Sequence, residues 1–467
     1  MITRAFLRLF AQIQMGTEGI LFFFVLFFLA SQTPTSARTN GSNRYQLPKG
    51  LKPITLPQKK FNPTKSNAFN KTPEAASEKP TTLQTQEGSD SVTETKLIPL
   101  PIYSTLPNEG NTFGFMPVFL VVEKESGRTQ SIIAPSVSWN PIIRLTHTFR
   151  WYFYPSNNSS LTVIPSVSSK INRNLTLEFN SAPQVFEERA GQFTYDASLH
   201  MRRSVFHRFF GLGPEAKTAN ETSFTKTGGD TAVRLGYNLS TYWNLGVRLG
   251  AERWLTERRR VDFLPLTHDR FTTLYGLQGS TVMSEGLSLR YDSRPYREFS
   301  DSGSQLEFAA TTFQGLSNSS NFVQTMIEAK HLFRLSERLS AGVRGYYSYV
   351  IGGAQVPFYF LSTLGGSNRL RGFTEDRFID RGAWTVELEP RLQLFQTRIY
   401  GVVADWRIDP FIALGQVFTK TSEAIAHTRV SGGLGFRAFV RPNVVGRVDL
   451  AAAGDGLKVY VELGYPF

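Results

Sequence analysis

The sequence predicts an all-β protein whose strands form a transmembrane antiparallel β-barrel. Two-faced segments, apolar on one side and polar on the other, recur roughly every 20 to 25 residues from Leu97 to the C-terminus, as in barrels of about 14 to 18 strands. Their polar faces carry mostly Arg, Glu and Asp, and segments of about 9–11 residues are long enough to cross a bilayer. A soluble sandwich would also alternate, with its apolar face in a core instead of against lipid. The charged faces and the alternating last segment favour the barrel.

Composition narrows the possible functions. The chain has 467 residues with 38 Phe and 17 Tyr, which suits strands with aromatic girdles, and it contains no Cys. Disulfides, thiolate metal ligands and a Cys nucleophile are therefore excluded. The net charge of +13 comes mainly from single Arg and Lys residues, with one cluster at Arg258-Arg259-Arg260. No basic helix with interleaved aromatic residues is present, so we expect no nucleic-acid partner.

The first 96 residues are expected to lie outside the barrel. Residues 1–37 resemble an export signal, with Arg4 and Arg8 before the apolar run Ile20 to Ala30 and a cleavage site at Ala37. The alternative, a membrane anchor, needs about 20 apolar residues, roughly twice that run. Residues 38–96 are rich in Pro, Thr, Ser and Lys, which predicts a disordered linker. The barrel is expected over residues 97–467.

The expected strands follow one another through the rest of the chain. Each has apolar residues at every second position and is bounded by turn residues. They are 112–123, 130–139, 145–154, 231–239, 244–252, 287–294, 340–351, 384–395, 429–441, 444–450 and 457–467.

The strand from Trp384 to Phe395 shows the pattern most clearly. Its even positions, such as Leu388, are apolar or Pro, whereas the odd positions include Glu387, Glu389 and Arg391. Successive side chains of a strand point to opposite faces. In a membrane barrel the apolar face meets lipid and these charges line the lumen.

The last strand must pair with the first, because an open edge in lipid leaves backbone groups unsatisfied. Pro117 and Pro466 lack a ladder donor, and Gly464 weakens the strand that ends at Phe467. These residues raise the hypothesis of a seam that opens sideways to lipid. The alternative is that they carry no gating role, since Pro135 and Pro165 fall in other expected strands.

A Gly-rich loop of about 30 residues joins two of these strands, which is long for such a connection. It contains Gly365, Gly366 and the run Leu370-Arg371-Gly372-Phe373. Glycines permit a tight excursion that would bring Arg371 to a buried partner. The alternative is a solvated surface loop.

Together, several motifs resemble those of the bacterial surface antigen superfamily of outer-membrane assembly and translocation barrels. These are Gly365-Gly366, Leu370-Arg371-Gly372-Phe373, Glu389-Pro390-Arg391, Tyr291-Asp292-Ser293-Arg294 and Tyr465-Pro466-Phe467. The resemblance covers residues from about 97 to 467. It implies a barrel of about 16 strands whose motif loop folds into the lumen, with Arg371 paired to acidic residues of neighbouring strands.

The chain departs from the family pattern in two places. Polypeptide-transport-associated domains usually precede the barrel, and here the Pro/Thr-rich linker stands in that place. The Asp that usually pairs with the loop Arg is replaced by Ala413. Acidic residues nearby are the candidate substitutes, on the lumen face together with Arg391: Glu387, Glu389, Asp405 and Asp409.

The resemblance implies a protein of the outer membrane of a Gram-negative bacterium that assembles proteins or translocates polypeptides or lipids by gating. Its partners would be the lipid bilayer and, in addition, client polypeptides or envelope lipoproteins. The alternative is a passive or ligand-gated pore for small solutes. Six scattered His residues lack metal-ligand spacing and no Gly-x-Ser-x-Gly motif occurs, so we expect no metal, cofactor or catalytic site.

Overall fold

The computed structural model describes residues 93–463 apart from 107, 125–127, 157, 182–188, 296–299, 400–401 and 441–443. The predicted signal peptide and nearly all of the predicted linker lie outside the described residues. The first strand begins at Thr93, so it takes in the last four residues of the predicted linker.

Twenty strands form one antiparallel sheet, and two short ones, β16 and β17, form a second sheet. The bounds are β1 Thr93–Leu106, β2 Gly110–Glu123, β3 Thr129–Ile133, β4 Ser136–Asn140, β5 Arg144–Thr148, β6 Trp151–Ser156, β7 Ser159–Ser168, β8 Arg173–Ser181, β9 Phe193–Phe209, β10 Thr222–Asn238, β11 Trp243–Glu257, β12 Ser280–Asp292, β13 Gly303–Ser317, β14 Phe322–Arg334, β15 Leu339–Gly352, β16 Ser362–Leu364, β17 Phe378–Asp380, β18 Gly382–Ile399, β19 Val402–Phe418, β20 Arg429–Val440, β21 Val444–Ala453 and β22 Gly456–Leu463.

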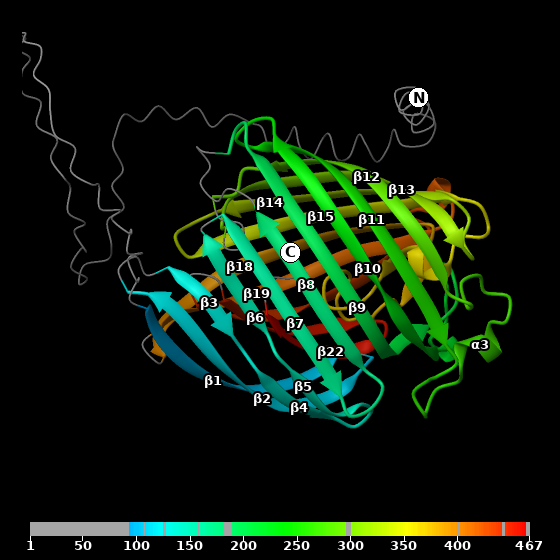
Figure 1. Ribbon diagram of the computed structural model, residues 1–467, viewed down its shortest axis with the longest axis horizontal. Coiled ribbons are helices and arrows are strands. Elements are labelled where there is room, and N and C mark those ends of the chain that lie inside the picture. Colours follow the sequence, from blue (N-terminus) through cyan, green and yellow to red (C-terminus); the bar gives the residue numbers. More distant parts are fainter. Residues whose placement is uncertain are drawn as a thin grey trace, which may run out of the picture. The chain divides into compact units, whose positions relative to one another are not determined.

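The sheet closes on itself, because β1 pairs both with β2 and with β22. Figure 1 shows the strands running obliquely around the wall, with green strands in front and yellow-to-red strands behind. The predicted all-β antiparallel barrel is confirmed.

Two of the expected strands are interrupted. β3 and β4 lie end to end along β2, and their junction at Pro135 splits the expected strand 130–139. Likewise β6 pairs with β3 and β5 with β4, which splits the strand 145–154. When each interrupted pair counts as one, the twenty strands make 18 rows in the described wall, more than the about 16 expected. The break between β3 and β4 falls at Pro135 because proline lacks the N–H that a continuous ladder needs.

Along most of the wall, apart from the first strands, apolar side chains face outward and charged side chains face inward. On β18, Leu388 is 42% exposed while the neighbouring Glu387 is 2% exposed. On β11, Leu249 is 61% exposed. A soluble sandwich would bury these leucines, so the inverted arrangement identifies the wall of a membrane barrel.

Long connections gather at one end of the barrel, here named the loop end. They include residues 258–279, which contain the short helix α3 (Thr267–Arg270), and the connection from β15 to β18. The opposite end, named the terminus end, holds Thr93 and Leu463, where the described wall begins and finishes. Within the described residues, no helix has the length and apolar character that a membrane crossing requires.

Candidate functional site

Residues 353–381, named the inward loop, leave the loop end and return into the lumen. The loop contains a 3-10 turn (Phe358–Phe360) and the hairpin formed by β16 and β17. Between the hairpin strands, Gly365 and Gly372 have φ values of 118° and 103°. A Cβ atom at Gly365 would collide with the carbonyl oxygen of Thr374. Glycine is therefore required at Gly365 for the loop to turn back toward the wall.

Arg371, at the tip of the inward loop, is completely buried among three carboxylates. Its Nη2 donates to Glu389 Oε2 at 2.9 Å and also to Glu387, both on β18. Its Nη1 donates to Asp449 Oδ2 on β21 at 3.0 Å. One guanidinium thus joins the tip of the loop to two strands that are separated in the wall by β19 and β20.

The surroundings keep Arg371 charged. Burial disfavours the cation, but the carboxylates of Glu387, Glu389 and Asp449 outweigh it and raise the pKa of Arg371 above its ordinary value. The guanidinium carbon also lies 3.5 Å from the ring centroid of Phe411 on β19, in a cation–π contact. A buried charge is tolerated when it is paired in this way.

The acidic partners of Arg371 are themselves held by other arginines. Arg437 on β20 contacts Asp449 Oδ1 at 2.5 Å and Asp409 Oδ2 at 3.3 Å. Arg391 contacts Glu389 Oε1 at 3.1 Å. The carboxylates are therefore fixed in place by the wall, which forms a preorganised socket for the arginine of the loop.

A second set of contacts ties the inward loop to the last strand. The N–H of Gly372 donates to Tyr460 Oη at 3.0 Å, and this hydroxyl donates to the carbonyl oxygen of Phe373 at 3.2 Å. In the turn after β21, Asp455 accepts from the N–H of Thr374 at 3.1 Å. Tyr460 lies on β22, the strand that closes the barrel against β1.

Apolar packing surrounds the ionic contacts. Leu370 and Phe373 flank the Arg371–Gly372 pair in sequence and are buried. They pack in one cluster with residues of the hairpin and of the wall strands β18 and β19: Leu364, Phe378, Ala383, Ala413 and Val417. This cluster excludes water from the socket, which strengthens its electrostatic interactions.

The structure brings some of the expected site residues together and separates others. Glu387 and Glu389 both contact Arg371, whereas Arg391 contacts Glu389. The two aspartates offered as substitutes have other partners. Asp409 pairs with Arg437, and Asp405 accepts from Gln396 Nε2 at 2.5 Å. Gly365, Gly366, Gly372 and Phe373 all lie in the hairpin around Arg371.

The third partner of Arg371, Asp449, was missed from the sequence. Asp449 lies between the apolar Val448 and Leu450 of the expected strand 444–450, and this alternation is the signal that could have found it. The position of the expected Asp is taken by Ala413, which packs against the apolar part of the loop. The carboxylate is supplied instead from β21, two strands further along the chain.

One of the expected seam residues, Pro117, needs correction. Pro117 lies on β2, opposite Pro99 of β1, because the first strand begins earlier than expected. Gly464 and Phe467 lie outside the described residues. In the described chain β1 pairs with β22 at Thr105 and Val459, near the loop end, whereas β1 pairs with β2 along its whole length.

Glu375 in the inward loop gives the site a predicted pH dependence. Burial raises the pKa of Glu375 to about 8 from 4.5, and the carboxylates of Asp376 and Glu109 add to the effect. A carboxyl with a raised pKa binds its proton more tightly in the docked loop than in a released one. Its stabilisation is complete below 4.5 and is lost as the pH rises through about 8.

We therefore expect the inward loop to be cleaved faster by a protease at pH 9 than at pH 6. Glu375→Gln should reduce this difference, because the amide does not ionise, and Asp376, whose pKa is also raised by burial, accounts for the remainder. Glu337→Gln, at an exposed position in the turn after β14, is the matched control and should leave the difference intact. Equal cleavage at the two pH values in the unmodified chain would contradict the expectation.

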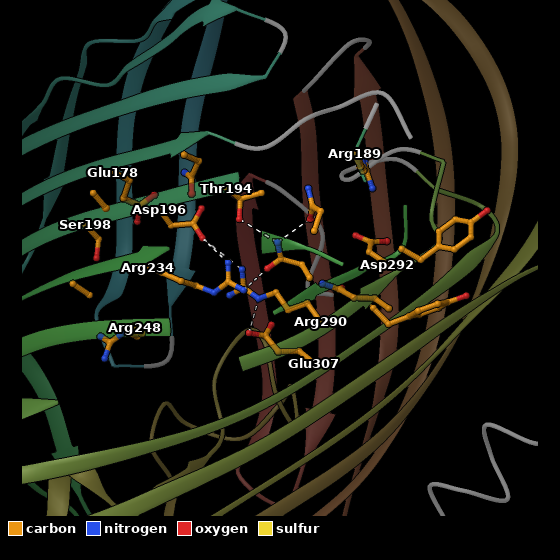
Figure 2. Close-up of a pocket in the computed structure, with 18 of the residues that line it drawn as sticks. Glu178, Arg189, Thr194, Asp196, Ser198, Arg234, Arg248, Arg290, Asp292 and Glu307 are labelled. Carbon is orange, nitrogen blue, oxygen red and sulfur yellow. Dashed lines mark hydrogen bonds and ion pairs between the residues drawn. The ribbon is translucent and has the colours of Figure 1, made fainter. Parts of the chain in front are cut away.

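A polar cavity of about 650 Å³ lies elsewhere on the lumen wall, lined by strands from β8 to β13. Figure 2 shows Arg234 directed toward Asp196, and Arg290 lying between Asp196 and Glu307. Arg234 Nη1 lies 3.4 Å from Asp196 Oδ2, and Arg290 Nε lies 2.9 Å from Glu307 Oε1. Such a lining suits a water-filled interior.

An antiparallel barrel with apolar side chains outside, paired charges inside and an inward-folded loop defines a class of transmembrane outer-membrane-type barrels. The sequence profile of the Omp85 superfamily domain matches residues 157–450, more than half of the chain. The chain therefore belongs to the Omp85 superfamily. The resemblance drawn from the motifs is confirmed, and the chain is an outer-membrane β-barrel of a family of non-enzymatic proteins.

Many solved structures are similar to this chain, and three of them are BamA and CdiB proteins. BamA from Haemophilus ducreyi lacking POTRA domains 1–3 has 14% identity over 79% of this chain and 74% of that one, with a TM-score of 0.48. CdiB from Escherichia coli has 11% identity over 79% and 62%, with a TM-score of 0.45. CdiB from Acinetobacter baumannii has 9% identity over 80% and 60%, with a TM-score of 0.40. No curated protein sequence matches the chain significantly.

Proposed function

We propose that this protein gates the passage or insertion of polypeptides or lipids at the outer membrane of a Gram-negative bacterium, with the inward loop as the gate. Membership of the Omp85 superfamily supports the general role in assembly or translocation. The gating mechanism is proposed from the contacts of the loop. Client polypeptides or envelope lipoproteins would be its partners beyond the bilayer.

The observation that carries the proposal is that one loop holds three strands near the end of the chain. Arg371 joins β18 and β21, and Gly372 and Phe373 join β22 through Tyr460. Docked, the loop occupies the lumen and keeps β22 in position for its pairing with β1. Released, it would free both the lumen and the last strand.

The seam is the part of the wall that this release would affect most. β1 carries Pro99 and Pro101, which lack ladder donors, so β22 has fewer backbone partners on β1 than an ordinary strand would offer. An open seam exposes an edge strand, and an extended polypeptide can pair with such an edge by adding a strand. The proposal therefore assigns the seam as the route by which a client reaches the bilayer.

Closing the seam covalently tests the proposal. Because the chain has no Cys, Thr105→Cys with Val459→Cys gives a single possible disulfide between β1 and β22. Under oxidising conditions we expect loss of client insertion or translocation in reconstituted vesicles, with recovery after a reducing agent. Client insertion or translocation is measured in the same vesicle preparation before and after the disulfide is reduced.

A matched control places the disulfide inside the wall. Leu235→Cys with Val247→Cys links β10 to β11 at directly opposed positions and should leave activity unchanged. Full activity of the oxidised seam pair, with the cross-link verified by mass, would refute passage through the seam.

The alternative function is a pore for small solutes, which the polar cavity of about 650 Å³ favours. A pore should conduct steadily in a planar bilayer with the inward loop in place. The gating proposal instead expects low conductance that rises when Arg371→Ala releases the loop. Equal steady conductance in both proteins would favour the pore.

A further inference from the structure

Four prolines of the first strands lie in one row across the outer wall. Pro99 of β1 lies directly opposite Pro117 of β2. Pro135, at the junction of β3 and β4, lies opposite Pro117. The row continues through Phe149, at the junction of β5 and β6, to Pro165 of β7.

Strand register fixes this alignment. Phe119 pairs with Ile133 and Phe115 with Val137, which places Pro117 against Pro135 between them. In the same way, Thr148 pairs with Ser166 and Trp151 with Val163, which places Phe149 against Pro165. The prolines are far apart in sequence, and only the register brings them together.

The row interrupts the sheet without cutting it. Proline has no N–H to donate, so the ladder loses a donor at each of the four positions. Backbone bonds still join the strands at the row: Ala134 N–H donates to the Arg150 carbonyl at 2.8 Å, and Phe149 N–H to the Pro165 carbonyl at 3.0 Å. The strands remain associated, but the outer surface has a recess at the row, where uninterrupted strands would form a continuous wall.

The recess is a cavity of about 570 Å³ on the outer face. Its apolar side chains come from β2, β4 and β7 and from both junctions, and several are exposed, Val167 by 54% and Val137 by 45%. The lining residues are Phe115, Pro117, Pro135, Ser136, Val137, His147, Thr148, Phe149, Pro165, Ser166 and Val167.

The polar groups of the lining are largely occupied by each other. The hydroxyls of Thr148 and Ser166 lie 2.8 Å apart, and Arg150 Nη1 donates to Ser136 Oγ at 2.8 Å. His147 is the one ionisable side chain of the lining, and it is exposed. A ligand in this recess therefore meets mainly hydrocarbon.

The recess lies at the depth of the bilayer core. Pro99 and Pro117 fall at the middle of 14-residue strands. Pro165 is the seventh of the ten residues of β7. The middle of a barrel strand lies in the apolar band, where the surrounding molecules are lipid chains.

We propose that this recess binds one acyl chain of a membrane lipid. The occupant follows from three features together: the recess opens on the lipid face, it lies at mid-depth, and its exposed surface is apolar. Its volume falls within the range of about 300–1,000 Å³ typical of ligand sites. The remaining wall, such as Leu245, Val247 and Leu249 of β11, offers lipid an ordinary strand surface instead.

Photo-cross-linking tests the proposal with the full chain. The protein is reconstituted in phosphatidylethanolamine vesicles that contain a small fraction of the same lipid with a diazirine on its acyl chain. After irradiation, we expect several-fold more adducts on the recess peptides, around residues 115–117, 135–137 and 165–167, than on residues 245–249. Val137→Phe, which fills the recess, should reduce these adducts to the level of β11.

Val247→Phe is the matched control, because it adds the same volume to an ordinary lipid-facing position and should leave the recess adducts unchanged. Migration on a gel before and after boiling verifies that each variant is folded. Equal adduct density in the recess and on β11, or recess adducts that persist in Val137→Phe, would overturn the proposal. Adducts in vesicles but none in native outer membranes would also overturn it, because another molecule would then occupy the recess.

Discussion

Arg371→Ala is expected to release the inward loop and to lower the free energy of unfolding of the barrel by about 3–5 kcal/mol. This is the cost of removing one partner of a buried ion pair while the other partner stays buried. The substitution leaves Glu387, Glu389 and Asp449 without the cation they share. We expect faster proteolysis of residues 353–381 and a lower temperature for the heat-induced shift in gel migration.

Arg369→Ala is the control for loss of a positive charge from the same loop. Arg369 stacks on the ring of Tyr346 at 3.7 Å and makes no ion pair with the three carboxylates. We expect it to leave the loop docked. A double-mutant cycle between Arg371→Ala and Glu389→Gln should show coupling, since the two side chains are in direct contact. Additive effects would contradict the pairing.

Asp449→Ala is expected to have an effect of similar size, about 3–5 kcal/mol, because one carboxylate serves two buried guanidiniums. Asp449 contacts Arg371 at 3.0 Å and Arg437 at 2.5 Å, and all three side chains are fully buried. The loss should therefore loosen β20 as well as the inward loop. The temperature of the heat-induced shift in gel migration reports the loosening of the barrel, and the rate of proteolysis of residues 353–381 reports the loosening of the inward loop.

Asp405→Asn tests whether the third acidic partner of Arg371 is Asp449, as in the structure, or Asp405, as the sequence suggests. Asp405 was expected among the partners of Arg371, yet it accepts from Gln396 near the terminus end of β18 and β19. We expect Asp405→Asn to leave loop docking unchanged. If Asp405→Asn released the loop while Asp449→Ala did not, the assignment of the third partner would be wrong.

Alternation along single strands was enough to predict the barrel and the inward face of β18. Glu387 and Glu389 could be found because they follow the loop closely in sequence and share one face of one strand. Asp449 belongs to β21, and its nearness to Arg371 depends on closure of the whole sheet. A pattern of period two does not contain that information.

The first strand was missed for a related reason. Residues 97–102 read Leu-Ile-Pro-Leu-Pro-Ile, which is apolar or proline at every position. Ile98 and Leu100 pack inside against the cluster around Met116, while Leu97 is exposed outside. Such a strand has two apolar faces and no alternation. The proline row was equally hidden, because its members align only through cross-strand register.

The central claim is that the wall is apolar outside and that Arg371 holds the inward loop inside. Single cysteines at Ile412 and Ala413, neighbours on β19, test both parts with a water-soluble maleimide. Ile412 faces outward, and Ala413 is buried beneath the loop. We expect neither cysteine to react in otherwise unmodified protein, and Arg371→Ala to make the cysteine at 413 alone reactive. Rapid labelling at 412, or labelling at 413 that does not depend on Arg371, would contradict the account.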